Sequence, residues 1–451
     1  MNREFPQITH LGAEHTVTGS CHLMQVNGLN IMVDCGIPQG RDHVIPIEKW
    51  PVKPRELDFL FLTHAHIDHI GRLPELVKRG FHGEIITTHP TKALIIPMLR
   101  DAMGFLSLSE SRITALSQTI NNLSWGFEYN QEFDLRKGIK FKLGCAGHIL
   151  GSCFIRFTEK ESGRSVLFSG DLGATDTPIL PDPDKAEGAD LLILESTYGD
   201  RLHEDRHQRV QRLGDALTRA LSDRGKVFIP AFALGRTQEL IYEIDRLFSD
   251  PEYEQVFPSL SKDHRPSVFI DSPLGLEITE IYSRLSEYWD KEAKEIYSHG
   301  DHPIDFARLY AVKNYKSHNG LIDMAGPAII IAGSGMCTGG RILDHLAFGL
   351  NEGKNDIFFV GYQAAETLGR KIIKYGKRPN GYVYLDGKRI DIKAGIHTLT
   401  GYSAHADQKG LIQWVESMGK KPKRIKLVHG ELEAQLTLSK ALSHRGYSVV
   451  D

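Results

Sequence analysis

The chain has 451 residues, 41% of them hydrophobic and 25% charged, and at about 150 residues per domain this length suggests two to three domains with substantial cores. With 43 glycines and 20 prolines, the composition is that of a globular protein rather than a disordered or fibrous one. The formal net charge is −3, which excludes a cationic field over the whole chain. Any site for a polyanion must therefore be local.

Cysteine usage and the lack of long apolar runs indicate the cellular compartment. The five cysteines are scattered and form no CxxC pair, which argues against a disulfide framework or a thiolate zinc site. The N-terminal residues lack the apolar core of a signal peptide, and no apolar run approaches the roughly 18 residues that a membrane span needs. We therefore expect a cytoplasmic protein with no membrane partner.

Short apolar runs that end in polar residues are typical of the first 200 positions. Runs of this length, bounded by Gly, Asp or His, are more often buried strands than helices. We predict strands at 31–33, 59–62, 165–168 and 191–194. Polar side chains are therefore expected to gather at strand ends in this part of the chain.

A second pattern begins near residue 226. Apolar runs at 227–229, 268–270, 329–331 and 357–360 each lead through a loop, mostly rich in Gly or Pro, into a helix. Repeated βα units predict a mostly parallel sheet covered by helices, with ligands at the carboxyl ends of its strands. Strand-like alternation returns at 381–392, and a last βα unit starts at 425–428.

The strongest chemical signal is the run from His64 to His69, which reads HAHIDH. Four specified positions make this motif far more specific than a lone Gly pattern. Directly after a buried strand, His64 and His66 can point the same way, while Asp68 and His69 can turn toward a second point nearby. Imidazole and carboxylate ligands suit zinc, and catalytic zinc sites keep one position open for water.

Four further residues at strand ends could complete such a site. They are Asp34, His148, Asp171 and His429. Each is weak evidence alone, because a single Asp or His beside Gly is usually a turn or capping residue.

Together these residues resemble the metallo-β-lactamase superfamily, and specifically its β-CASP nucleases. Asp34, the HxHxDH run, His148 and Asp171 match the four superfamily motifs in order, and the resemblance covers nearly the whole chain. The three additional β-CASP motifs are matched by Glu195, His405 and His429.

The resemblance implies two zinc ions per chain. One would be held by His64, His66 and His148, and the other by Asp68, His69 and His429. Asp171 would bridge them, and Asp34 would orient ligands through hydrogen bonds. Manganese is a substitute that carboxylate-rich sites accept.

The resemblance also implies the fold, an α/β metallo-β-lactamase αββα sandwich with an inserted, Rossmann-like β-CASP domain. The first domain would be discontinuous, at 1–207 and 377–451, with the insertion at 208–376. The active site would lie between the two domains, where pockets are common.

Three polar segments of the insertion are candidate RNA contacts. The Gly-rich loop at 333–341 could offer backbone N–H groups to a phosphate, with Ser334, Gly335, Thr338 and Gly339 as the residues involved. Arg236 and Arg370 each begin a presumed helix. Such loops line the RNA channel in the β-CASP ribonucleases that the chain resembles.

The resulting hypothesis is a zinc-dependent ribonuclease that hydrolyses phosphodiester bonds, with a two-metal-activated hydroxide as nucleophile, in RNA processing or decay. Its substrate would be single-stranded RNA. His405, oriented by Glu195, would protonate the leaving 3′ oxygen. Asp68 is a second candidate for a catalytic role, as acceptor of the hydroxide proton.

Three alternatives stay open at this point. The first is a DNA-processing β-CASP nuclease. In that group the last motif usually carries Val and the first added motif usually carries Asp, whereas this chain has His429 and Glu195, and both differences favour RNA. A non-catalytic RNA-binding scaffold would have lost ligands, and none is missing here. The third is an ester or lactam hydrolase, which the insertion disfavours. The choice between endo- and exonuclease action and the oligomeric state, a homodimer included, are not indicated by the sequence.

Overall fold

The computed structural model describes residues 6–104, 106, 108–261, 263–364 and 366–451. The chain folds into two compact units. Unit 1 comprises Met1–Leu202 and His405–Asp451, and unit 2 comprises His203–Ala404. Each unit has its own sheets and its own buried core.

The first sheet of unit 1 begins as an antiparallel meander and continues as parallel strands. The strand order follows the chain: β1 (Gln7–Gly12), β2 (Cys21–Val26), β3 (Leu29–Val33), β4 (Phe59–Phe61), β5 (Glu84–Thr88) and β6 (Ser124–Phe127). The predicted strands at 31–33 and 59–62 lie in β3 and β4.

The second sheet of unit 1 joins distant parts of the chain. Its strand order is β21-β20-β11-β10-β9-β8-β7. The strands are β7 (Glu132–Asp134), β8 (Ile139–Cys145), β9 (Cys153–Glu159), β10 (Ser165–Phe168), β11 (Leu191–Glu195), β20 (Arg424–Val428) and β21 (Val449–Val450). β20 pairs in parallel with β11, with Glu195 opposite Val428. This register brings the residues that follow both strands to the same sheet edge.

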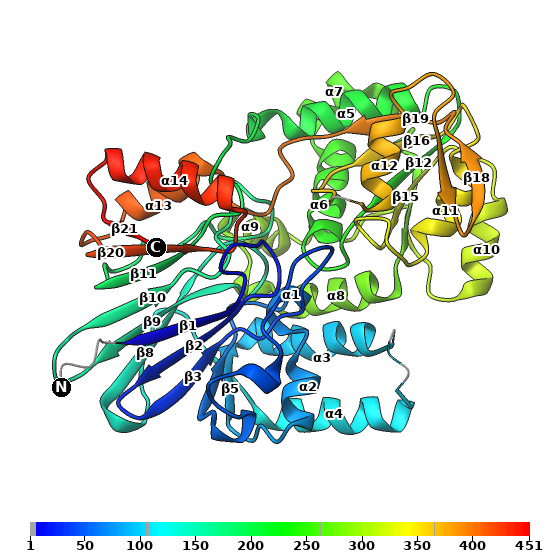
Figure 1. The fold of residues 1–451 in the computed structure, drawn as a ribbon. Coiled ribbons are helices and arrows are strands. Elements are labelled where there is room, and N and C mark those ends of the chain that lie inside the picture. The colour runs from blue at the N-terminus through cyan, green and yellow to red at the C-terminus, as the bar shows by residue number, and fades with distance from the viewer. Residues whose placement is uncertain (1–5, 105, 107, 262, 365) are drawn as a thin grey trace. The chain divides into compact units, whose positions relative to one another are not determined.

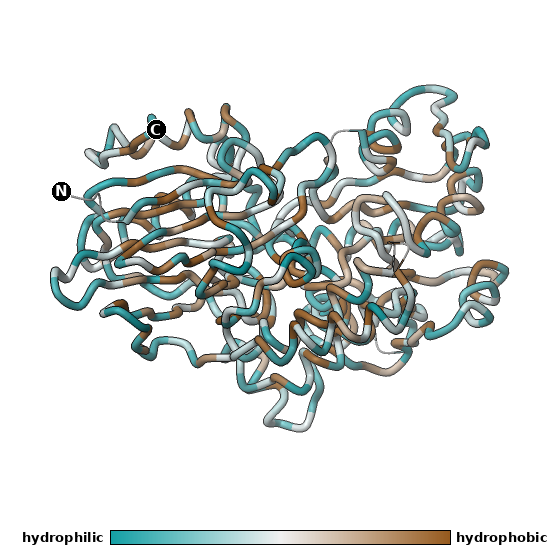
Figure 2. Tube along the Cα trace, turned by 60° about the horizontal axis from the view of Figure 1, so that its bottom comes forward, coloured by the Kyte–Doolittle hydropathy of each residue, from teal (hydrophilic) through white to brown (hydrophobic). Residues whose placement is uncertain are grey.

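The core of unit 1 lies between these two sheets. Alternate side chains of both sheets face each other there, and the ring centroid of Phe61 lies 5.0 Å from that of Phe141 and 4.7 Å from that of Phe157. Figure 2 shows brown, hydrophobic stretches along these neighbouring strands. Burial of several aromatic rings at once is a large contribution to the stability of a sandwich.

Helices cover the outer faces of both sheets, as Figure 1 shows. Near the first sheet are α1 (Ile67–Ile70), α2 (Leu73–Lys78), α3 (His89–Gly104) and α4 (Glu110–Leu123), and on the second are α13 (Gln408–Glu416) and α14 (Leu432–His444). Trp414 of α13 and Leu438 of α14 pack with Leu192 and Leu194 of β11. The layers are therefore helix, sheet, sheet and helix, which confirms the predicted αββα sandwich.

Unit 2 is built on a six-stranded sheet whose pairs are all parallel, in the order β14-β13-β15-β12-β16-β19. The strands are β12 (Lys226–Pro230), β13 (Ser267–Asp271), β14 (Leu309–Ala311), β15 (Ala328–Ala332), β16 (Asp356–Phe359) and β19 (Gly395–Thr398), and a separate hairpin is formed by β17 (Tyr382–Leu385) and β18 (Lys388–Asp391). The predicted parallel, Rossmann-like sheet is therefore present.

The helices of unit 2 alternate with its strands. They are α5 (Arg209–Ala220), α6 (Arg236–Ser249), α7 (Pro251–Val256), α8 (Pro273–Arg284), α9 (Lys291–Ser298), α10 (Tyr315–Asp323), α11 (Ile342–Gly349) and α12 (Leu368–Tyr375). The core beside α11 and α12 contains Leu346, Ile372 and Ile330, and the hairpin adds Val383 and Leu385 to it.

The hairpin and β19 group with unit 2, although the sequence-based boundary at 376/377 assigns them to the first domain. β19 pairs with β16, with Ile396 opposite Ile357. Because this pairing makes β19 the edge strand of the unit 2 sheet, the chain leaves unit 2 only after Ala404.

Candidate metal centre

The HAHIDH run occupies the connection between β4 and α1. His66 is the residue before α1, and Asp68 and His69 lie in that helix. The backbone N–H of Cys35 donates to the carbonyl of His69 at 2.7 Å. A Cβ atom at Gly36 would lie 1.5 Å from the carbonyl oxygen of Asp68, so only glycine permits this close approach. The loop after β3 therefore fixes the position of α1.

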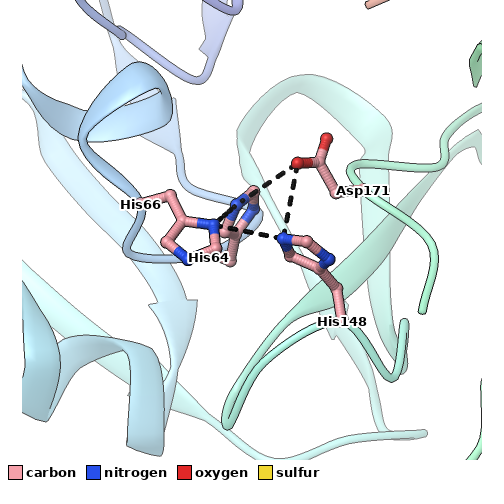
Figure 3. A group of neighbouring side chains, drawn as sticks. All are labelled: His64, His66, His148 and Asp171. Atoms are coloured by element: carbon pink, nitrogen blue, oxygen red, sulfur yellow. Dashed lines mark hydrogen bonds and ion pairs between the residues drawn. The ribbon is translucent and has the colours of Figure 1, made fainter. Parts of the chain in front are cut away.

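One group of potential ligands consists of His64, His66, His148 and Asp171, whose ring nitrogens and carboxylate meet in Figure 3. Nδ1 of His66 lies 3.1 Å from Nε2 of His64 and 3.1 Å from Nε2 of His148. Oδ2 of Asp171 lies 3.5 Å from Nε2 of His64 and 3.6 Å from Nε2 of His148. Three of the four side chains are buried, and His66 is half-buried.

A second group consists of Asp68, His69 and His429. Nε2 of His69 and Nε2 of His429 are 3.1 Å apart. Oδ2 of Asp68 lies 3.8 Å from Nε2 of His429 and 4.0 Å from Nε2 of His69. His429 follows β20, so the β11–β20 pairing carries this ligand from the far end of the chain to the HAHIDH run.

Asp171 joins the two groups. Its Oδ2 faces His64, His148 and His69, the last at 3.3 Å, whereas its Oδ1 lies 3.5 Å from Nε2 of His429. Within the described part of the chain, Oδ1 is buried without a hydrogen-bond partner. A buried carboxylate oxygen of this kind needs a partner, and its place between histidines suits a carboxylate that bridges two metal ions.

The donor geometry fits divalent ions. Ligand atoms about 2.1 Å from one tetrahedral ion lie about 3.4 Å apart, and the separations within the first group are 3.1–3.6 Å. Burial lowers the pKa of His64 well below its usual range and that of His66 to about 4. Both rings therefore offer a neutral nitrogen, the form that binds metal.

Asp34 contacts His69 on the side of the ring that faces away from Asp171. Its Oδ2 lies 2.7 Å from Nδ1 of His69, which leaves Nε2 of that ring directed at Asp171. Thr63 contributes a contact that sequence reasoning missed. Its backbone N–H donates to Oδ1 of Asp34 at 2.8 Å, and its hydroxyl lies 3.1 Å from Nδ1 of His64. The only sequence signal for this role is the position of Thr63 directly before the motif.

His405 and Glu195 form a pair beside Asp171. Nδ1 of His405 lies 3.2 Å from Oε1 of Glu195, and Nε2 lies 4.0 Å from Oδ2 of Asp171. Glu195 is fixed by backbone N–H groups, because Leu172 donates to its Oε1 at 2.7 Å and Thr197 to its Oε2 at 3.1 Å. Burial opposes protonation of His405, but the charge and hydrogen bond of Glu195 raise its pKa to about 9.

The hydroxyl of Thr197 orients the other late ligand. It lies 3.1 Å from Nδ1 of His429, which leaves Nε2 of that ring for the second group. Sequence reasoning missed this residue too, since nothing in the sequence shows that a threonine 232 positions away contacts His429.

A third group, Asp271, His318 and His345 of unit 2, also has its potential ligand atoms within 4.8 Å of one another. Here both imidazoles lie 2.6 Å from the same Oδ2 of Asp271, and Nη1 of Arg341 lies 2.7 Å from Oδ1. Nitrogens this close to one oxygen are hydrogen-bond donors, and a guanidinium repels a bound cation. We therefore interpret this group as a hydrogen-bonded network that holds Arg341.

The candidate RNA contacts differ in accessibility. Arg236 begins α6, but it is only 7% exposed, forms an ion pair with Glu239, and lies over the ring of Tyr402. Arg370 is exposed in the first turn of α12. Their contacts with RNA stay predictions, and the geometry favours Arg370.

The Gly-rich loop connects β15 to α11, as predicted. Several of its polar groups form hydrogen bonds within the loop. The N–H of Ser334 donates to the carbonyl of Gly339, and the N–H of Cys337 donates to the carbonyl of Ser334. The N–H of Thr338 donates to the hydroxyl of Ser334 at 2.9 Å. Gly339 has open space where a Cβ would stand. The side chain of Thr338 is exposed. Contacts of Ser334, Gly335, Thr338 and Gly339 with a phosphate stay predictions.

Three family profiles match the chain in succession. The metallo-beta-lactamase superfamily matches residues 16–231, the Beta-Casp domain 237–372, and the Zn-dependent metallo-hydrolase RNA specificity domain 389–450. The chain is also 35% identical over 444 residues to Ribonuclease TTHA0252 of Thermus thermophilus, covering 98% of this chain and 97% of that protein. The chain belongs to the β-CASP family of the metallo-β-lactamase superfamily.

Other β-CASP relatives agree with this assignment. Transcription termination factor FttA of Methanocaldococcus jannaschii is 30% identical over 436 residues, which cover 94% of this chain and 67% of that protein. A crystal structure of a protein of unknown function from Enterococcus faecalis V583 aligns with a TM-score of 0.56 at 13% identity, covering 98% of this chain and 96% of that one. At that identity the likeness supports the fold alone.

The predicted β-CASP membership and α/β fold class are confirmed. The metallo-β-lactamase fold implies divalent metal ions, and the described residues include His and Asp groups of the kind that bind them. Among the described residues, every helix is too short or too polar to cross a membrane.

Proposed function

We propose that this β-CASP protein is a zinc-dependent ribonuclease that hydrolyses single-stranded RNA in RNA processing or decay. The enzyme is a metal-dependent nuclease, and its relatives include a protein named as a ribonuclease. The observation that carries the proposal is the position of Asp171 beside the His405–Glu195 pair. Its Oδ2 lies 3.3–3.6 Å from histidines of both groups, and its Oδ1 lies 3.5 Å from His429 of the second group.

The residues present would hold two ions. His64, His66 and His148 would bind one, Asp68, His69 and His429 the other, and Asp171 both. When bound, a pair of divalent ions supplies a water-derived nucleophile at neutral pH and stabilises the negative charge that develops on a phosphate. The predominance of imidazole favours zinc, and the carboxylates permit manganese as a substitute.

His405 would supply the proton for the leaving group. Its Nδ1–H is committed to Oε1 of Glu195, so Nε2 is the atom that can donate, and the side chain is 20% exposed. With its pKa raised to about 9 by Glu195 against the effect of burial, the ring carries a proton at neutral pH. An alkoxide leaving from phosphorus needs that proton, and a positioned acid of this kind accelerates such steps about 10²–10⁴-fold.

Asp34, Thr63 and Thr197 would act by orientation. Each contacts the Nδ1 side of a ligand imidazole and leaves the opposite nitrogen for the metal. Partners of this kind fix the tautomer and the ring direction. A direct proton-accepting role for Asp68 is a separate proposal, since its carboxylate also belongs to the second ligand group.

The proposed cellular location is the cytoplasm. The five cysteines are all unpaired thiols and buried, which suits a reducing compartment.

Cleavage of matched oligonucleotides tests the function. Two RNAs of one sequence, labelled at the 5′ or the 3′ end, and the DNA of the same sequence are incubated with zinc-loaded protein. The proposal predicts faster cleavage of RNA, and the two labels distinguish internal cutting from removal of nucleotides at one end. Equal rates on RNA and DNA would favour the DNA-nuclease alternative. Binding of RNA without cleavage by the metal-loaded protein would favour the scaffold alternative.

A further inference from the structure

A strongly basic surface lies at the end of unit 2, outside the residues assigned so far except for Arg370. It comprises α12, the following turn and the β17–β18 hairpin, residues 368–393, and we name it the hairpin surface. Eight Lys and Arg side chains fall in this segment, against two Asp, although the whole chain has a net charge of −3. The basic residues are Arg370, Lys371, Lys374, Lys377, Arg378, Lys388, Arg389 and Lys393, and all eight are exposed.

The hairpin is built so that its aromatic residues point outward. Val383 and Leu385 are buried in the core of unit 2, and because side chains alternate along a strand, Tyr382 and Tyr384 lie on the opposite face. Tyr382 is 40% exposed and Tyr384 is 63% exposed. Figure 1 shows the hairpin in orange beside α11 and α12.

The turn of the hairpin fixes this register. Asp386 and Gly387 have φ values of 49° and 76°, the left-handed values that a two-residue Asp-Gly turn requires. Tyr384 then pairs with Arg389, and Tyr382 with Asp391. The outward positions of both strands are therefore set by a short, locally encoded element.

The outward side chains already show the contacts that nucleic-acid bases use. The guanidinium of Arg389 lies 4.1 Å from the ring centroid of Tyr382, and the rings of Tyr382 and Tyr384 meet edge to face with centroids 5.7 Å apart. Tyr375, the last residue of α12, has two cations near its ring: Arg378 of the following turn lies 5.2 Å and Lys374 lies 5.6 Å from the ring centroid. Among the ion pairs between described residues, one involves these eight cations: Nε of Arg389 lies 3.0 Å from Oδ1 of Asp391.

We propose that the hairpin surface binds single-stranded RNA, with bases stacked on Tyr382 and Tyr384 and phosphates bound by the surrounding Lys and Arg side chains. The inference rests on the proposed function for its choice of polyanion, and it extends that function by a second contact with the substrate. An ordinary solvated face carries charges of both signs and few exposed aromatic rings. Positive charge interleaved with exposed aromatic rings is the combination that single-stranded nucleic acids require.

RNA is favoured over a protein partner by charge and by shape. Eight exposed cations around two tyrosines offer little apolar area for a protein interface, and they match the regular negative charge of a phosphate backbone. A duplex hides the faces of its bases, so stacking on tyrosine rings selects unpaired strands.

The binding test uses the full chain in a chelator, so that RNA is not cut. Fluorescence anisotropy measures binding to a labelled RNA of about 30 nucleotides, which is long enough to span several stacking sites. Three proteins are compared: wild type, the double variant Tyr382→Ala/Tyr384→Ala, and Tyr382→Phe/Tyr384→Phe, which keeps the rings. Removal of both rings should weaken binding at least about tenfold, because each stacked base contributes a large factor, and the Phe variant should bind like wild type. Tyr310→Ala, a similarly exposed tyrosine on β14, is the matched control.

The phosphate contacts have their own readout. Lys374→Gln/Lys388→Gln should lower the slope of log affinity against log salt by about 1.4, since each contact with a single strand contributes about 0.7. Lys291→Gln, whose side chain is 91% exposed on α9, should leave the slope unchanged. Unchanged affinity in the double Ala variant, or equal losses for RNA and for the base-free polyanion heparin, would overturn the proposal.

Cleavage assays separate this inference from the proposed function. If wild type cuts RNA, the Ala variant should show a raised KM on the long substrate and an unchanged rate on a substrate of a few nucleotides. If wild type cuts no RNA, the proposed function fails, whereas the anisotropy result still decides whether the hairpin surface binds it.

Discussion

Nδ1 of His405 lies 3.2 Å from Oε1 of Glu195, although the two residues are 210 positions apart. The pair exists because β11 ends at Glu195 and the chain re-enters unit 1 at His405 after completing unit 2. The backbone N–H groups of Leu172 and Thr197 fix the carboxylate, and the carboxylate fixes the imidazole. A proton on Nε2 of His405 is thereby directed toward Asp171, at 4.0 Å.

The proposed acid role predicts a selective loss of rate in His405→Ala. This variant should keep its metal and its RNA affinity but cleave RNA about 10²–10⁴-fold more slowly. If the leaving 3′ oxygen is replaced by sulfur, which departs without a proton, the variant should recover much of its rate relative to wild type. Asp171→Ala serves as the comparison and should not recover. Equal losses on both substrates, together with reduced metal content, would assign His405 a structural role.

Glu195→Gln is expected to damage the same step more mildly. The amide can still accept from Nδ1 of His405 and from Leu172, but it removes the negative charge that raises the pKa of the imidazole. The basic limb of the pH–rate profile should therefore move to lower pH, since less of the His405 population carries a proton there. Rates on the 3′-sulfur substrate measured across pH are the check, and they should not show this displacement. A shift that appears on both substrates would contradict the assignment.

Thr63→Val tests the contacts behind the metal ligands. The substitution removes the hydroxyl that contacts Asp34 and His64, and losses of such orienting partners typically weaken metal affinity about 10–100-fold. Competition with a chromophoric zinc chelator measures this affinity. Thr87→Val, which removes a buried hydroxyl bonded to the Leu62 carbonyl at 2.8 Å, is the control and should bind zinc like wild type. Similar affinities for the two variants would refute the orienting role.

The buried carboxyl of Asp245 on α6 should make the free energy of unfolding of unit 2 depend on pH. Burial raises the pKa of this carboxyl to about 7, and the side chain is 7% exposed. Between about pH 4 and 7 the folded state holds a proton that the unfolded state has released, so the free energy of unfolding falls as the pH rises through this window. Asp245→Asn cannot ionise and should be more stable than wild type at about pH 8, by up to about 4 kcal/mol, with no advantage near pH 4.

Thermal midpoints of unfolding at about pH 4 and about pH 8, on either side of this window, measure the difference. Asp215→Asn on α5 changes an exposed carboxyl and should leave both midpoints unchanged. If Asp245→Asn is equally or less stable than wild type at the higher pH, Asp245 is accommodated as an anion by contacts other than its bond to Ser249.

Strands, and the residues that gather in the candidate metal centre, were predictable where the signal lies in adjacent residues. The apolar run at 165–168 coincides with β10, and the HAHIDH spacing indicated a metal centre before any fold was known. The edge strand β19 was not foreseen, because its four residues include glycine and are at most half-buried, so pairing with β16 decides its conformation. Contacts such as Thr197 with His429 depend on tertiary structure and leave no local trace.

The burial of Arg236 shows the same limit in another form. The sequence presents an arginine at a helix start, which suggests a phosphate contact, but Glu239 follows three residues later and pairs with it on the helix. The spacing was visible in the sequence, since residues three apart on a helix are neighbours. The position of Arg236 over the ring of Tyr402 depends on tertiary structure and was not visible in the sequence.

The central claim is that two metal ions held around Asp171 make this chain a ribonuclease. Stepwise addition of zinc to metal-free protein, with bound metal and RNA cleavage measured in the same samples, tests it most directly. Cleavage should rise from zero and saturate at two ions per chain. Asp171→Ala should neither fill both sites nor cleave RNA. His299 is an exposed histidine of unit 2, and His299→Ala should behave like wild type. RNA cleavage at full rate by metal-free protein, or by Asp171→Ala, would contradict it.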